Sequence, residues 1–192
     1  MTQSGETVAR RLPPGSHGIP ADVVARNQRE RLVAAMAEAC AEKGYAGASV
    51  ADVAKRAGVS SVTFYKQVAD KHDCMLAAHE ELLGRLLEGI DGAVGGEQEP
   101  KAQRRAALAA LLSMLAADPP SARLLTVEIL AAGPTGVERH DEMVEQLRRR
   151  IGAEWVPVAG ALALIGRLVM AGEADRLLSL EDELAGTLSS QV

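Results

Sequence analysis

The strongest constraint on the fold of this 192-residue chain is a run of helix start and stop signals between residues 49 and 71. Ser49 stands three residues before Asp52, and in this arrangement a serine hydroxyl and an acidic side chain cap a helix N-terminus reciprocally. Gly58 suits the left-handed backbone conformation in which many helices end. The sequence therefore predicts a short helix over residues 50–57, followed by a tight turn.

A second helix must begin directly after this turn. Ser60 is a suitable N-cap, and the residues that follow give about two helical turns before Asp70 caps a third helix. Phe64 and Val68 are four residues apart, so their side chains share a face, which we expect to point inward. The pattern thus predicts two short helices about a tight turn, with residues 61–67 forming the second.

The outward side of this second helix carries small, hydroxyl-bearing and basic side chains. The short side chains of Ser61, Val62 and Thr63 would let the helix approach base edges in a DNA groove. The longer side chains of Tyr65 and Lys66 would reach phosphates. This chemistry favours a duplex DNA ligand.

The run KGYAGASVADVAKRAGVSSVTFYKQVADKHDCMLAA, residues 43–78, resembles the N-terminal DNA-binding domain of the TetR family of bacterial transcriptional regulators. The motifs that carry the resemblance are Lys43-Gly44-Tyr45, Val53-Ala54 before Ala57-Gly58-Val59-Ser60, Thr63-Phe64-Tyr65 and Asp70-Lys71. They cover about a fifth of the chain. Beyond residue 90 the resemblance rests on an all-helical pattern and on chain length.

By this resemblance, the DNA contacts fall on nine residues. They are Ser49, Ser60, Ser61, Val62, Thr63, Tyr65, Lys66, Gln67 and Lys71. The resemblance also implies a palindromic duplex operator, bound by a homodimer that is most often a repressor. Members of the family often carry basic residues where Ser61 and Val62 stand, so fewer cations would enter the groove here. They usually carry an aromatic side chain where Val68 stands, so less apolar area would be buried beneath the helix.

The whole chain has helical patterns and no convincing strand, so we expect an all-α fold of about nine helices. The expected division is a flexible arm at residues 1–20, a three-helix helix-turn-helix DNA-binding domain at 21–70, and a helical ligand-binding and dimerisation domain at 71–192. The arm contains Arg10 and Arg11, and it fits either a disordered tail or a basic arm that enters the minor groove. Gly44 is expected to end the first helix.

Helix boundaries in the second part follow from prolines, glycines and caps. The sequence predicts helices over residues 101–117, Ser121 to Ala132, 136–151 and 156–173, and a last helix capped by Ser179. The last two helices are apolar and lack enough partner surface within one subunit. We therefore predict a homodimer in which residues 156–190 form a four-helix bundle with their copies.

The net charge of −5 is unevenly distributed. Residues 1–75 hold ten Lys or Arg against eight Asp or Glu, a balance of +2, whereas residues 76–192 hold eleven against eighteen, a balance of −7. The sign of this asymmetry suits DNA binding by the N-terminal part, with modest and salt-dependent attraction to phosphate. The uncharged runs are shorter than the roughly 18 residues needed to span a bilayer, so we expect no membrane contact. The two cysteines are distant in sequence and no secretory signal precedes them, which predicts a cytoplasmic protein.

An effector site is harder to predict. Met114, Leu125, Met143, Leu147 and Trp155 fit either an apolar cavity or ordinary core, and the resemblance implies a ligand domain. Aromatic residues make up only 2% of the chain, which disfavours a cage for flat cationic compounds. We expect an uncharged aliphatic or acyl-like effector.

The sequence shows no pattern of enzymatic chemistry. The four histidines have no metal-ligand spacing, and no phosphate loop, nucleophile elbow or clustered carboxylates stand out. We therefore expect no metal, no cofactor and no enzyme activity. Besides the DNA-binding regulator, two alternatives stay open. One is a small-molecule sensor or carrier with a weakened DNA-binding head, and the other is a helical enzyme.

Overall fold

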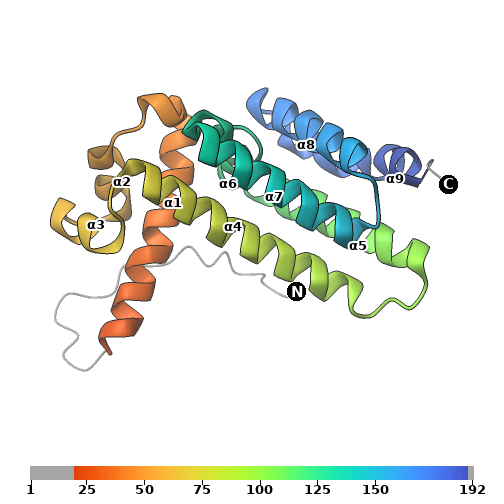
Figure 1. Ribbon diagram of the computed structural model, residues 1–192, viewed down its shortest axis with the longest axis horizontal. Coiled ribbons are helices and arrows are strands. Elements are labelled where there is room, and N and C mark those ends of the chain that lie inside the picture. The colour runs from red at the N-terminus through yellow and green to blue at the C-terminus, as the bar shows by residue number, and fades with distance from the viewer. Residues whose placement is uncertain (1–19, 190–192) are drawn as a thin grey trace.

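The computed structural model describes residues 20–189, and within this range its regular secondary structure is entirely helical (Figure 1). The α-helices are α1 Ala21–Gly47, α2 Val50–Ala57, α3 Ser61–Gln67, α4 Lys71–Val94, α5 Pro100–Ala117, α6 Pro119–Thr126, α7 Pro134–Ile151, α8 Trp155–Met170 and α9 Glu181–Ser189. Two 3-10 helices join them, η1 Glu128–Ala132 and η2 Ala174–Leu180. The predicted all-α class with about nine helices is confirmed. Residues 1–19 of the predicted arm, with Arg10 and Arg11, lie outside the described residues.

Helices α1, α2 and α3 lie together at one end of the molecule (Figure 1), and we call residues 20–70 the head and residues 71–189 the body. Gly44 has a φ of 70° and breaks α1, so the prediction that regular helix ends there is confirmed. Phe64 and Val68 are both buried, as predicted from their spacing. The side chain of Phe64 is completely inaccessible, which anchors α3 to the head.

The segment from Ser121 to Ala132 was predicted as one helix, and this prediction is wrong. Val127 leaves the helical conformation, with φ −127° and ψ −59°, and separates α6 from η1. The prolines preceding the segment belong to α6 itself, because the first turn of a helix needs no backbone N–H donors from them. Asp118 caps this turn by accepting a hydrogen bond from the Ser121 amide at 3.1 Å.

The predicted capping role of Ser179 is also wrong. Its hydroxyl donates to the Arg176 carbonyl oxygen at 2.7 Å, and η2 continues directly into α9 at Glu181. The last α-helix is consequently shorter than expected. It packs against α5 and α8, and the guanidinium of Arg105 on α5 donates to the Glu181 carboxylate at 2.9 Å.

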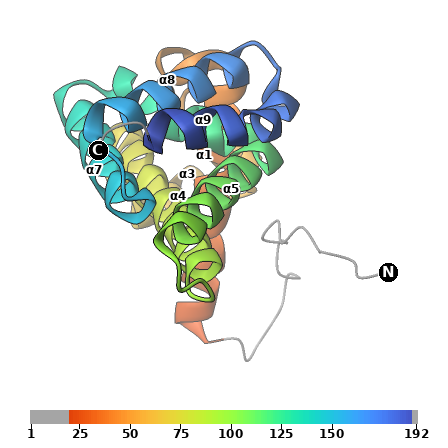
Figure 2. The ribbon, with the colours of Figure 1, turned by 90° about the vertical axis from the view of Figure 1, so that its right-hand side faces the viewer.

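The long helix α4 runs from the head into the body, with α7 packed beside it and α8 beyond α7 (Figure 1). Seen along the long axis, α8 and α9 form one outer face of the body (Figure 2). Within residues 20–189, no helix alone has the length and apolar content to cross a membrane. The consecutive helices Pro134–Ile151 and Trp155–Met170 meet both criteria only as a pair, bent by 111°.

Candidate nucleic-acid interface

The helix-turn-helix of the head is built by the caps that the sequence predicted. The Ser49 hydroxyl oxygen accepts a hydrogen bond from the Asp52 amide at 3.2 Å, and the Asp52 carboxylate accepts one from the Ser49 amide at 3.0 Å. This reciprocal pair fixes the start of α2. Gly58 ends α2 with φ 63° and ψ 35°, a left-handed conformation that glycine adopts without a Cβ clash. The short turn therefore directs α3 across α2.

Local contacts also fix the start of α3. The Ser60 hydroxyl oxygen accepts a hydrogen bond from the Thr63 amide at 3.1 Å, and the two hydroxyl oxygens lie 3.0 Å apart. The Arg31 guanidinium on α1 donates to the carbonyl oxygen of Ala57 at 2.7 Å, which satisfies an acceptor at the end of α2. The position of α3 thus depends on α1, α2 and its own cap.

The outward face of α3 carries four of the predicted DNA-binding residues. Val62 is 67% exposed and Tyr65 57% exposed, and Ser61 and Lys66 are exposed beside them. The Tyr65 ring packs edge-on against Phe64, with centroids 5.4 Å apart. These residues form a short, sterically open face that could enter a major groove.

The remaining predicted contacts have internal partners. Ser49 and Ser60 are exposed but serve as caps, and Thr63 is half-buried beside Ser60. The Gln67 amide donates to the Gln28 side chain at 3.3 Å. Their direct contact with DNA stays a prediction.

Lys71, also predicted to contact DNA, is turned toward the end of α1. Its ammonium group donates to the carbonyl oxygens of Tyr45 and Ala48 at 2.9 and 3.0 Å, and lies 4.4 Å from the centre of the Tyr45 ring. Lys71 therefore holds α4 to the end of α1. A phosphate contact by its third N–H stays a prediction.

Several cations of the head are neutralised locally. Lys43 lies 2.6 Å from the Asp52 carboxylate, and this hydrogen bond is the main cause that lowers the pKa of Asp52 to about 2. Arg56 pairs with Glu42. In the part of the chain that the structure describes, the exposed ammonium groups of Lys55 and Lys66 have no hydrogen-bond or ion-pair partner. They are available to phosphate.

An ion pair of the body, between Arg123 on α6 and the buried Glu128 on η1, is hydrogen-bonded to the head, and sequence reasoning missed it. Glu128 on η1 accepts a hydrogen bond from the Tyr45 amide at 2.6 Å and another from Arg123 at 2.8 Å. Arg123 also donates to the Ala41 carbonyl oxygen at 2.8 Å. In the sequence, the feature that could have indicated this contact is one charged residue, Glu128, within the apolar run LLTVEILAA.

The five predicted effector-binding residues do not form one site. Met114 and Leu125 line a cavity of about 150 Å³ between α4, α5 and α6. Met143 and Leu147 are completely buried in the core, and Trp155 is 41% exposed at the start of α8. The structure therefore brings only Met114 and Leu125 together at a cavity.

The two cysteines are buried thiols of low reactivity. Cys40 and Cys74 are buried, and burial raises the pKa of both thiols to about 12. Such thiols are poor nucleophiles and poor metal ligands at neutral pH. Among residues 20–189, no group of three or more His, Cys, Asp or Glu side chains is arranged to hold a metal ion.

Comparison with protein-family models matches residues 32–78, which include all of α2 and α3, to bacterial regulatory proteins of the tetR family. An uncharacterized HTH-type transcriptional regulator of Bacillus subtilis, YvdT, is 34% identical over 70 residues, which are 36% of each chain. A fatty acid metabolism regulator protein of the same species is 27% identical over 88 residues, which are 46% of this chain and 45% of the relative. The chain therefore spans less than half the length of these two curated relatives.

The fold extends the similarity over the body. The crystal structure of the regulator FadR of B. subtilis, in complex with stearoyl-CoA, superposes with a TM-score of 0.73. The match covers 84% of this chain and 98% of that one at 19% identity, so it indicates a common fold.

Proposed function

Because this chain belongs to the TetR family of bacterial regulatory proteins, we propose that it is a ligand-responsive transcriptional regulator that acts as a repressor. In this proposal it binds a palindromic duplex operator as a homodimer. In this proposal residues 21–70 bind DNA, and residues 71–192 bind the effector and dimerise. The protein acts in the cytoplasm, where its operator lies. The observation that carries the proposal is the exposed face of Ser61, Val62, Tyr65 and Lys66 on a rigidly capped α3.

A two-fold operator requires two heads at a fixed separation, and α8 supports such a dimer. Its exposed residues recur three or four apart along one side, where two helices would meet. They are Val156, Gly160, Ala163, Arg167 and Met170. Small residues at the centre of this α8 stripe would let two helices approach closely, and nothing lies within 4 Å of a Cβ placed on Gly160. The predicted dimer through residues 156–190 is therefore retained here, with α8 as its main contact.

Packing offers a route by which the body can move the head. The start of α7 lies so close to η1 that a Cβ on Gly136 would fall 2.0 Å from the Ile129 carbonyl oxygen. Glu128 on η1 is in turn bonded to the Tyr45 amide of the head. A shift of α7 would therefore be transmitted to the end of α1, and would change the separation of two heads that must enter successive major grooves about 34 to 36 Å apart.

A gel shift with DNA that flanks the protein's own coding sequence tests the proposal. We expect the parent protein to retard this DNA and Val62→Glu to lose the retardation, because a carboxylate on the outward face of α3 would meet phosphates and base edges. Val137→Glu, on the exposed side of α7, is the control and should bind normally. Retardation by Val62→Glu equal to that by Val137→Glu would contradict the outward face of α3 as the DNA contact. No retardation by the parent protein would favour a sensor whose head has lost DNA binding.

A further inference from the structure

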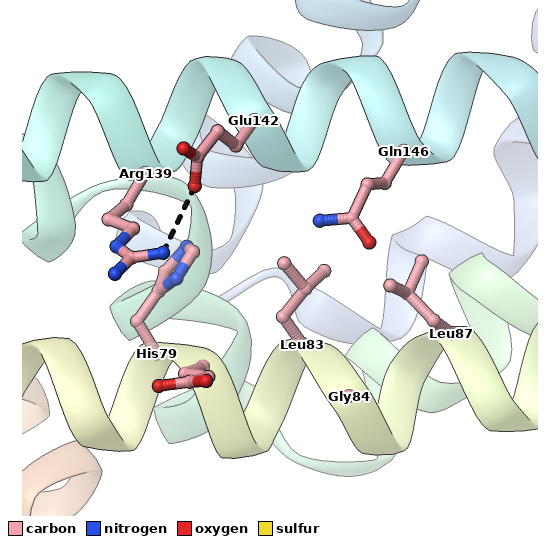
Figure 3. A pocket seen from close by; sticks show the side chains of 8 residues that line it. His79, Leu83, Gly84, Leu87, Arg139, Glu142 and Gln146 are labelled. Atoms are coloured by element: carbon pink, nitrogen blue, oxygen red, sulfur yellow. Dashed lines mark hydrogen bonds and ion pairs between the residues drawn. The ribbon is translucent and has the colours of Figure 1, made fainter.

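A groove of about 280 Å³ lies between α4 and α7 (Figure 3). Leu83 and Leu87 of α4 point into it from one side, and the Gln146 amide faces them from α7. Gly84 lies between the two leucines and leaves the backbone of α4 bare, and a Cβ placed there would meet nothing within 4 Å. The middle of the groove therefore has an apolar floor on α4, with the Gln146 amide opposite it on α7.

His79 lines the end of this groove nearest Arg139 (Figure 3). The residue is only 1% exposed, and its Nε2 atom is buried without a hydrogen-bond partner among the described residues. Buried polar atoms of this kind are rare because leaving them unpaired costs free energy. An external hydrogen-bonding group would remove that cost.

The groove carries no excess positive charge. The Arg139 guanidinium donates to the Glu142 carboxylate at 3.1 Å, and Glu80 adds a second carboxylate to the lining. Burial, and then the proximity of His140 and Arg139, lowers the pKa of His79 to about 4, so its imidazole is neutral near pH 7. A ligand carboxylate would have to displace Glu142 from Arg139 and would still face Glu80.

We propose that this groove binds a small uncharged amphiphile, with an aliphatic body over Leu83, Gly84 and Leu87 and one hydroxyl or carbonyl head group that bonds to His79 and Gln146. The volume is many times the roughly 10–15 Å³ that a single buried water molecule needs, so the groove has room for a small organic molecule. The binding site is inferred from the groove and its lining residues, and it does not depend on the proposed function. Only the claim that its ligand is the effector rests on the proposed function.

Calorimetric titration of the full chain with 1-octanol, octanoate and octanoyl-CoA at pH 7.5 tests the ligand class. These probes share a chain length and differ in the charge and size of the head group. We expect 1-octanol to bind about tenfold more tightly than octanoate, because the lining already holds two carboxylates. Tighter binding of octanoate or of octanoyl-CoA would overturn the proposal, as would no binding of 1-octanol.

Two glycines of α4 provide a matched test of the location. Gly84→Met would place a flexible apolar side chain in the groove, and we expect 1-octanol affinity to fall about tenfold or more. Gly92→Met is the control, because Gly92 lies on the same helix, outside the groove and in open space. Equal affinity in the two variants would contradict the site.

Removal of the unpaired nitrogen tests the polar contact. His79→Leu should weaken 1-octanol binding by about threefold to tenfold while leaving binding of the chain to DNA intact. Unchanged 1-octanol affinity would remove His79 from the site. Gel shifts on the Gly84→Met protein and on the parent protein separate the two proposals. If Gly84→Met binds DNA but not 1-octanol, the result supports the proposed function and locates the ligand in the groove. If the parent protein binds 1-octanol but no DNA, the result refutes only the proposed function.

Discussion

Glu128, on a 3-10 helix of the body, accepts a hydrogen bond from the Tyr45 amide of the head, 83 residues earlier in the chain. The bond falls where Gly44 breaks α1, so the head is held at the point where its longest helix changes direction. Arg123 completes the contact by bonding to both Glu128 and the Ala41 carbonyl oxygen. The orientation of the head therefore depends on a buried charge of the body.

Glu128→Gln should loosen this junction. The amide leaves Arg123 without its charged partner, and we expect the free energy of unfolding to fall by about 1–3 kcal/mol. Glu138→Gln, at an exposed position on α7, should change it by less than about 0.5 kcal/mol. Urea unfolding measures both values, and equal stability of the two variants would show that the contact is not maintained in solution.

His79→Leu should remove part of the pH dependence of stability. The pKa of His79 is lowered to about 4 by burial, whereas a histidine in an unfolded chain titrates near 6.5. Between these values the unfolded state binds the proton and the folded state does not, so acidification from about pH 6.5 to about pH 4 destabilises the parent by on the order of 1 kcal/mol per pH unit.

Urea unfolding at pH 5 and pH 7.5 measures this difference. His140 contributes a slope of the same sign, because burial also lowers its pKa, and it is present in both proteins, so the comparison isolates the part of the slope that depends on His79. The variant should therefore lose less stability than the parent on acidification. An identical loss would mean that His79 is solvated in solution.

Lys66→Ala should weaken binding to all DNA sequences and reduce its salt dependence. Each neutralised phosphate contributes about 0.9 to the slope of log K against log salt, so a dimer with two heads should lose about two units of slope. Lys101→Ala, at an exposed position of α5, should keep the parent slope. Fluorescence anisotropy at several salt concentrations gives the slopes, and an unchanged slope for Lys66→Ala would contradict a phosphate contact.

Ala163→Glu should dissociate the proposed dimer, because it would bury a carboxylate at the centre of the α8 stripe. Light scattering should then give the mass of one 20.2 kDa chain, while Ser113→Glu on the exposed side of α5 should keep the parent mass of about twice that value. A dimeric Ala163→Glu protein would place the interface elsewhere.

The sequence predicted the head well because its helix ends depend on neighbouring residues. Ser49 and Asp52, Gly58 and Ser60 act within a few positions of one another, so their spacing alone predicts the caps. The break at Val127 was missed because it accompanies a contact between Glu128 and Tyr45, which are distant in sequence. Such pairing is not visible in helical periodicity.

The same reason limits prediction of a ligand site. His79 and Gln146 line one groove only when α7 packs on α4, and the sequence instead suggested Trp155, which is 41% exposed at the start of α8. Apolar residues at helical spacing predict burial, but they do not distinguish a filled core from a cavity. Met143 and Leu147 illustrate this, because both are core.

Hydroxyl-radical footprinting on the DNA that flanks the coding sequence tests most directly whether paired α3 helices read a symmetric operator. We expect two protected half-sites related by two-fold symmetry, with centres about one helical turn, roughly 34 to 36 Å, apart on one face of the duplex. Protection should disappear with Val62→Glu and persist with Val137→Glu. A single asymmetric footprint, or one that survives Val62→Glu, would contradict this mode of binding.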